Sequence, residues 1–164
     1  MAVVTIRCTQ KLLRRVPLAA SIADPTTRLG DWYANILFAR PEQLVLCVSE
    51  RSLLPVVVPA RPAAALPLRL AQSLAEVLAR LGVEPVHVAN EQREMESFAF
   101  GRTSNRRVLG TLNELMLQLS WYLRANPAMS LLEASLKLAR TPCSAVAGAF
   151  PDRATLSLFS AASC

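Results

Sequence analysis

Three arginines surround the point at which the sequence predicts the start of a long helix. They lie in the segment Gly101-Arg102-Thr103-Ser104-Asn105-Arg106-Arg107. A helix begins with unpaired N–H groups and about half a positive charge, so Arg106 and Arg107 in its first turn are electrostatically disfavoured. A bound anion would relieve this repulsion, because the helix end, the guanidinium groups and the side chain of Ser104 or Asn105 would all contact it. The segment therefore predicts an anion-binding site.

The same arginines have a second interpretation, in which they pair with acidic residues of the preceding segment, Glu91, Glu94 and Glu96. Two residues farther along the predicted helix are open to similar alternatives. Asn113 lies on the flank of the apolar stripe, where its amide would bind either a ligand or a neighbouring loop. Gly110 weakens the helix, and close packing of a neighbouring strand is favoured over a ligand as the reason for it.

A second candidate site is a polar pocket formed by Asp31, Trp32, Tyr33 and Asn35. These residues lie where a turn leads into a segment of alternating polarity. The competing interpretation is that the two aromatic residues belong to the core and its rim, as is usual at the start of a strand.

Cysteine and histidine are too few and too widely spaced for a metal site. Cys8, Cys47, Cys143 and Cys164 lie far apart, and His87 is the one histidine. Zinc sites need ligands at short, regular spacings, so we expect neither a metal nor a cofactor. The chain also lacks a Gly-x-Ser-x-Gly motif, a Gly-rich phosphate loop and a dinucleotide fingerprint, and no residue stands out as catalytic.

The patterning of apolar residues predicts the elements that would position these candidates. Expected strands lie near 3–6, 32–38, 44–48, 55–59, 83–89 and 98–100, and the prolines of 55–59 make that strand an edge. Expected helices are a short one after Thr9 and longer ones over 66–81, 105–126 and 130–140. The order of elements predicts an α+β fold with a small, mostly antiparallel sheet packed against two or three helices.

Length and composition predict one domain over residues 1–148, followed by a weakly patterned tail, 149–164, in which Leu156 to Phe159 would add a strand. Hydrophobic residues make up 52% of the chain, with 18 basic and 12 acidic residues and a net charge of +6. This balance permits phosphate or acidic partners without requiring them. Lys11, Arg14 and Arg15 are typical of a solvated helix face. Without a long apolar run, an export signal or a disulfide pattern, we expect a cytoplasmic protein that does not engage a membrane.

Four segments resemble, in order, a family of small uncharacterised bacterial proteins, a domain of unknown function. They are Arg7-Cys8-Thr9-Gln10-Lys11-Leu12-Leu13, Leu29-Gly30-Asp31-Trp32-Tyr33-Ala34-Asn35, Asn105-Arg106-Arg107-Val108-Leu109-Gly110-Thr111-Leu112-Asn113-Glu114-Leu115 and Arg140-Thr141-Pro142-Cys143. The resemblance extends to about residue 143 and implies a bacterial single-domain protein. It supplies no activity, cofactor or catalytic residue.

Three functional hypotheses follow from these observations. The favoured one is a non-enzymatic binding or regulatory module that recognises an anionic partner at the start of the 105–125 helix. That partner would be a phosphate-bearing ligand, a nucleic acid or an acidic protein surface, and Arg7, Lys11, Arg14 and Arg15 would assist in binding it. The second is a small enzyme acting on a phosphorylated or carboxylated metabolite, and the third is a docking or inhibitor module with an apolar surface.

Overall fold

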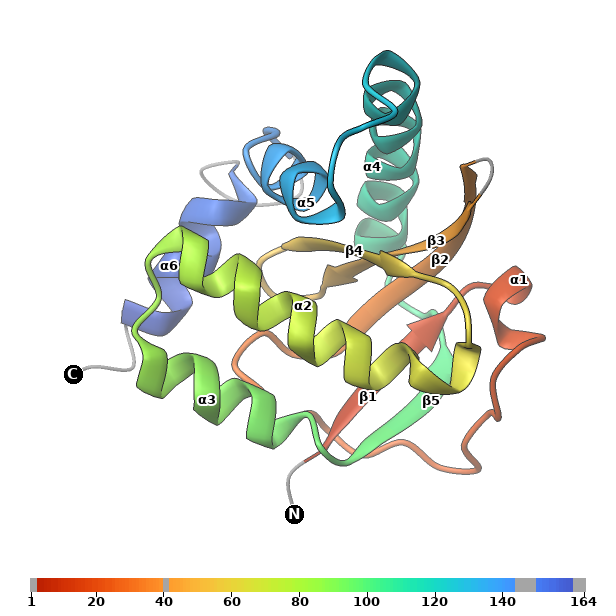
Figure 1. The fold of residues 1–164 in the computed structure, drawn as a ribbon. Coiled ribbons are helices and arrows are strands. Elements are labelled where there is room, and N and C mark those ends of the chain that lie inside the picture. The colour runs from red at the N-terminus through yellow and green to blue at the C-terminus, as the bar shows by residue number, and fades with distance from the viewer. Residues whose placement is uncertain (1–2, 40–41, 144–149, 161–164) are drawn as a thin grey trace.

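The computed structural model describes residues 3–39, 42–143 and 150–160, in which five strands form one mixed sheet (Figure 1). The strands lie in the order β4-β3-β2-β1-β5. Strand β1 runs parallel to both β2 and β5, whereas the β2–β3 and β3–β4 pairs are antiparallel. The strands span Val4–Cys8 (β1), Trp32–Ala39 (β2), Glu42–Ser49 (β3), Pro55–Pro59 (β4) and Phe98–Arg102 (β5).

Helices cover both faces of this sheet, so the core has two parts. On one face α2 packs against the strands, and α3 and α6 add side chains to the same part of the core, whereas α4 packs on the other face. Helix α5 lies along the edge strand β4, where the Ser135 hydroxyl accepts the Val57 N–H at 2.9 Å. The helices span Gln10–Leu13 (α1), Leu66–Leu81 (α2), Pro85–Glu94 (α3), Arg106–Ala125 (α4), Leu131–Ala139 (α5) and Pro151–Ser160 (α6), with a short 3-10 turn at Ala63–Ala65.

Strand alternation decides which side chains enter which part of the core. Ile6 and Trp32 belong to the part beneath α2, whereas Tyr33 belongs to the part beneath α4. Successive residues of a strand point to opposite faces, and β2 is buried on both over its first three residues. The first residues of β2 therefore contribute to both parts of the core.

Many of the predicted elements are confirmed, and so is the α+β class. The β2–β3 hairpin and the edge position of β4 are as expected. The helix 66–81 ends at Gly82, whose φ of 94° is the left-handed conformation that favours glycine. Ser130 caps α5 by accepting the Glu133 N–H at 3.1 Å. Within the described residues no helix is long and apolar enough to cross a membrane.

The expectation of a mostly antiparallel sheet is wrong. Only the hairpin connections of β2, β3 and β4 are short enough to impose antiparallel pairing. The chain between β1 and β2 instead passes through α1 and a long connection, which returns it to the same end of the sheet. Strand β5 follows α2 and α3 and also enters parallel to β1.

Two predicted strands are helices instead. Residues 83–89 alternate in polarity, but Pro85 occupies the first turn of α3, a position where its missing N–H costs nothing. His87 therefore lies on a helix and not on a strand. Residues 156–159 belong to α6, which buries Thr155 and Phe159 at a spacing of four residues, the period of a helix face. The expected tail thus includes a helix packed on the core.

Candidate functional site

The two arginine-bearing strands β1 and β5 end side by side, and the chain leaves them toward opposite faces of the sheet. After β1 it enters α1, whose Leu12 belongs to the core beneath α2. After β5 it enters α4, which covers the other face. In open sheets with parallel strands, ligands bind outside the carboxyl ends of the strands at such a reversal. The predicted anion site lies at this position.

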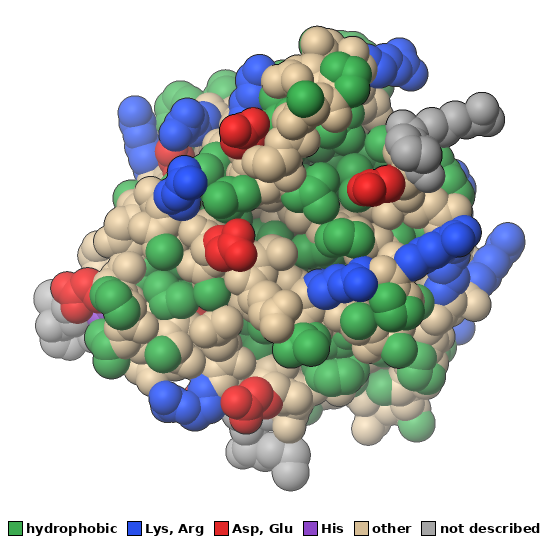
Figure 2. Space-filling model, in the orientation of Figure 1, with side chains coloured by type: hydrophobic (Ala, Val, Ile, Leu, Met, Phe, Trp, Pro, Cys, Tyr) green, Lys and Arg blue, Asp and Glu red, His purple; other side chains and the backbone are tan. Residues whose placement is uncertain are grey.

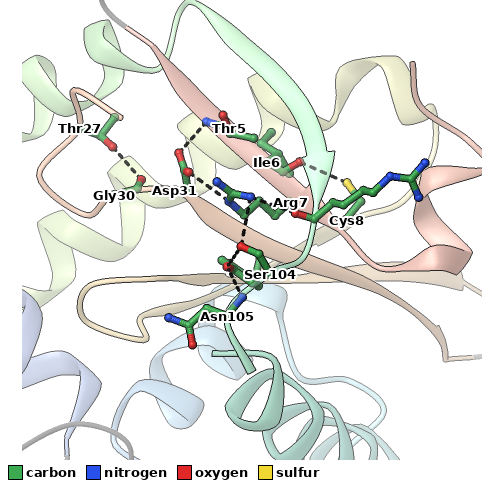
Figure 3. A network of polar contacts seen from close by, with 11 residues as sticks. Thr5, Ile6, Arg7, Cys8, Thr27, Gly30, Asp31, Ser104 and Asn105 are labelled. Carbon is green, nitrogen blue, oxygen red and sulfur yellow. Dashed lines mark hydrogen bonds and ion pairs between the residues drawn. The ribbon is translucent and has the colours of Figure 1, made fainter. Parts of the chain in front are cut away.

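Arg7, near the end of β1, holds the neighbouring segments together (Figure 3). Its Nε donates to Oδ2 of the buried Asp31 at 3.2 Å, and Asp31 Oδ1 accepts the Thr5 N–H at 2.9 Å. The Arg7 Nη1 donates to the Arg102 carbonyl at 3.1 Å and contacts the Ser104 hydroxyl at 3.4 Å. Both oxygens of Asp31 are therefore occupied, and the charge of Arg7 is balanced within the molecule.

The start of α4 is fixed against the sheet by a second set of hydrogen bonds. The buried Tyr33 hydroxyl accepts the Asn105 N–H at 3.0 Å and lies 3.3 Å from the Ser104 hydroxyl. Asn105 Oδ1 accepts the N–H groups of Arg107 and Val108 at 2.9 and 3.3 Å. Asn105 is thus the N-cap, and it satisfies two of the N–H groups that a bound anion would otherwise contact.

Two cations of the predicted site remain available at this end of the sheet. Arg102 and Arg106 are exposed, and neither has a carboxylate partner in the part of the chain that the structure describes. Alternation along β5 places Arg102 on the same face as Phe100, toward α1, whereas Arg106 begins α4 on the opposite face. The two arginines therefore flank the carboxyl ends of β1 and β5 from two sides. Arg107 is exposed in the same first turn.

Two of the acidic residues proposed as alternative partners, Glu91 and Glu94, have other roles. Glu91 is 2% exposed, and its two oxygens accept the N–H groups of Arg28 and Leu29 at 2.8 and 3.0 Å. Burial raises the pKa of Glu91, although these hydrogen bonds act in the opposite direction. Glu94 accepts the Thr26 hydroxyl at 2.6 Å. The predicted pairing with Arg102 or Arg106 does not form.

The second candidate pocket is divided by the sheet. Tyr33 and Asn35 lie on the face of α4, whereas Trp32 is fully buried beneath α2. Asn35 Oδ1 accepts the Thr9 hydroxyl at 2.6 Å and so helps to hold the start of α1. The structure therefore brings Asp31 and Tyr33 to the position of the predicted anion site, but it does not bring Trp32 there.

Asn113 lies on the exposed side of α4, two turns beyond Arg106, and is not brought to the site. Thr9, in contrast, is part of the arrangement although sequence reasoning did not select it, and Arg7, expected only to assist in binding the anion, holds the neighbouring segments together. The available signal was Arg7 between Ile6 and Cys8 in a buried strand, because a charge there needs a partner.

The histidine and the cysteines among the described residues lie in surroundings that differ from those of metal sites and reactive thiols. No group of histidine, cysteine and acidic side chains among them could hold a metal ion. Burial raises the pKa of the Cys8 thiol to about 12, and it raises the pKa values of Cys47 and Cys143 as well. His87 contacts the Phe159 ring, at 6.3 Å between centroids, away from the arginines.

Comparison with known proteins gives a match to a family. The model of a family described as a domain of unknown function (DUF6933) matches residues 5–154. No curated protein and no solved structure matches the chain.

Proposed function

The chain belongs to the family described as a domain of unknown function (DUF6933), and for this member we propose a non-enzymatic binding module that recognises an anionic partner. The partner would lie over the carboxyl ends of β1 and β5, at the start of α4. The observation that carries this proposal is the pair Arg102 and Arg106, exposed at the end of β5 and the start of α4 without carboxylate partners among the described residues. Exposed arginines of this kind bind carboxylates and phosphates through two parallel hydrogen bonds.

The hydrogen bonds around the site favour recognition by side chains. Asn105 already occupies the N–H groups of Arg107 and Val108, so the main chain offers fewer donors than a phosphate-binding loop does. Asp31 is engaged by Arg7 and Thr5, which leaves it unsuited to act as a general base. Binding without catalysis is the role that fits these constraints.

The test is fluorescence anisotropy with a labelled poly-glutamate peptide as the anionic probe. The variant Arg102→Gln/Arg106→Gln should bind the probe about tenfold more weakly, a loss of about 1.4 kcal/mol of binding free energy. Wild-type affinity should fall as sodium chloride rises toward about 0.15 M, because exposed charges are screened over about 8 Å there.

A matched control separates local recognition from net charge. Arg80 and Arg93 are exposed on α2 and α3, and charges of both signs are scattered over the face that these helices form (Figure 2). The variant Arg80→Gln/Arg93→Gln loses the same two charges and should keep wild-type affinity. Equal losses in the two double variants would mean that the probe senses only net charge, and the proposed site would be wrong.

A further inference from the structure

Helix α4 has a second apolar stripe, on the side that faces away from the sheet. Its inner side chains, Val108, Leu112, Leu115 and Leu119, are buried against β2 and β3. On the outer side Leu117 and Trp121 are 55% and 57% exposed. A surface helix normally presents polar residues to solvent, so two large apolar side chains one turn apart are unusual there.

The outer stripe continues over nearly the whole helix. Arg106, Gly110, Asn113, Leu117 and Trp121 follow one another at spacings of three or four residues, and each is exposed. Arg124 continues the same line. Alternating spacings of three and four place residues along one seam, as in helices that pair with another helix. From residue 106 to 124 the seam is about 27 Å long.

Gly110 supports contact with another backbone. A glycine inside a helix costs about 1 kcal/mol relative to alanine. The expected reason, a neighbouring strand packed against it, is wrong, because a Cβ added at Gly110 would meet no atom within 4 Å. The glycine leaves a gap in the outer surface of α4 that a partner segment could fill.

The distal end of the seam opens into an apolar groove. It has a volume of about 460 Å³ and lies between the end of β2 and the last turns of α4. Phe38, which is 57% exposed, lines it together with Leu37 and Leu123. An exposed aromatic beside a groove can anchor a side chain of a partner.

The positive charges at the two ends of the seam favour an acidic partner. Arg106 and Arg124 mark the two ends of the seam, and neither has a carboxylate partner among residues 3–39, 42–143 and 150–160. In a symmetric antiparallel pair of two α4 helices, Arg106 of each copy would face Arg124 of the other, which is repulsive. A partner helix with acidic residues beside an apolar stripe would satisfy both ends.

We propose that the outer face of α4, from Arg106 to Arg124, binds an acidic amphipathic helix of a partner protein. This inference rests on the proposed function, because Arg106 belongs to the anion site and to the seam. The apolar side chains of the partner would cover Leu117 and Trp121, and its carboxylates would reach the two arginines. Such helix-in-groove binding uses anchors at spacings of three and four residues.

The test uses a synthetic helix of about 20 residues, about 30 Å long, with leucine along one face and glutamate elsewhere. A scrambled peptide of the same composition is the control for net charge. The designed helix should bind at least about tenfold more tightly than the scrambled one. It should also shift the emission of Trp121 to shorter wavelength, since the other tryptophan, Trp32, is already fully buried.

Two variants locate the binding surface. Leu117→Gln/Trp121→Gln should lose the tighter binding of the designed helix but retain the binding of poly-glutamate. Leu68→Gln/Val86→Gln removes apolar side chains that are 62% and 58% exposed elsewhere, and it should bind like the wild type. All four positions are exposed, and circular dichroism checks that both variants are folded.

The outcomes distinguish this inference from the proposed function. Equal affinity for the designed and scrambled peptides, or unchanged binding by Leu117→Gln/Trp121→Gln, would overturn the docking inference while leaving the anion site intact. Sedimentation could instead show that the wild type is a dimer and that Leu117→Gln/Trp121→Gln is a monomer. The outer face of α4 would then bind a second copy of this chain, and the proposed acidic partner would be wrong. Loss of poly-glutamate binding only in Arg102→Gln/Arg106→Gln, without discrimination between peptides, would support the anion site alone.

Discussion

At the scale of single residues, the site depends on Arg7 and Asp31, which lie 24 positions apart in the sequence. The sequence was sufficient to predict a cap at Ser104 or Asn105, of which Asn105 is the cap, and Arg106 in the first turn, because capping depends on neighbours within one turn. It could not predict the Arg7–Asp31 pair, because that contact depends on the register of β1 against β2. A contact between residues within one helical turn could therefore be predicted, whereas a contact between two strands could not.

Glu91 gives a prediction at this scale. Burial raises its pKa above the ordinary value of 4.5, so between 4.5 and the raised pKa the native state binds more protons than the unfolded state. Stability contributed by Glu91 is therefore present below 4.5 and is lost as pH rises through the native pKa. We expect wild type to exceed Glu91→Gln in free energy of unfolding at low pH, and the difference to shrink as pH rises.

Urea unfolding of the two proteins at a series of pH values measures this difference. A wild-type advantage that grew with pH would show that the hydrogen bonds from Arg28 and Leu29 outweigh burial.

The buried thiols give a second prediction. Cys8, Cys47 and Cys143 are each 2% exposed or less, and their raised pKa values keep them protonated at neutral pH. In a Cys164→Ser variant, we expect Ellman's reagent to label no thiol in the native protein and all three in urea. Rapid labelling of one thiol in the folded protein would contradict the burial described for it.

At the scale of elements, two glycines should respond to alanine in opposite directions. Gly30 has a φ of 78°, and an added Cβ would lie 2.6 Å from Glu50 Cγ, so Gly30→Ala should destabilise the protein by about 1–2 kcal/mol. Gly110 lies in an open helical position, so Gly110→Ala should stabilise by about 1 kcal/mol. Thermal and urea unfolding of both variants test this, and a destabilised Gly110→Ala would mean that α4 needs the glycine internally.

The elements also show where periodicity is a sufficient guide. Helix α2 was predictable because its buried leucines and valine from Leu66 to Leu78 recur at the helical period. Helix α3 was mistaken for a strand because it is short and its one fully buried residue is the acidic Glu91. Because no apolar stripe marks the helical period, Val83, Val86 and Val88 around Pro85 resemble the residues of a strand.

At the scale of the whole molecule, the parallel pairing of β1 with β2 and β5 creates the site, and the sequence does not specify it. Those pairings bring together segments separated by α1 or by α2 and α3, so they depend on global packing and not on turn chemistry. Net charge is a weak guide for the same reason. The chain has a net charge of +6, but only basic side chains that the fold brings close together without carboxylate partners can select an anion.

The most direct test of the anion site is a titration of the ¹⁵N-labelled protein with poly-glutamate, followed by two-dimensional NMR. The amide signals of residues 8–10 and 102–107 should shift first and at the same peptide concentration. Shifts that begin around Arg80 or Arg93, or that spread evenly over all exposed arginines, would contradict the proposed site.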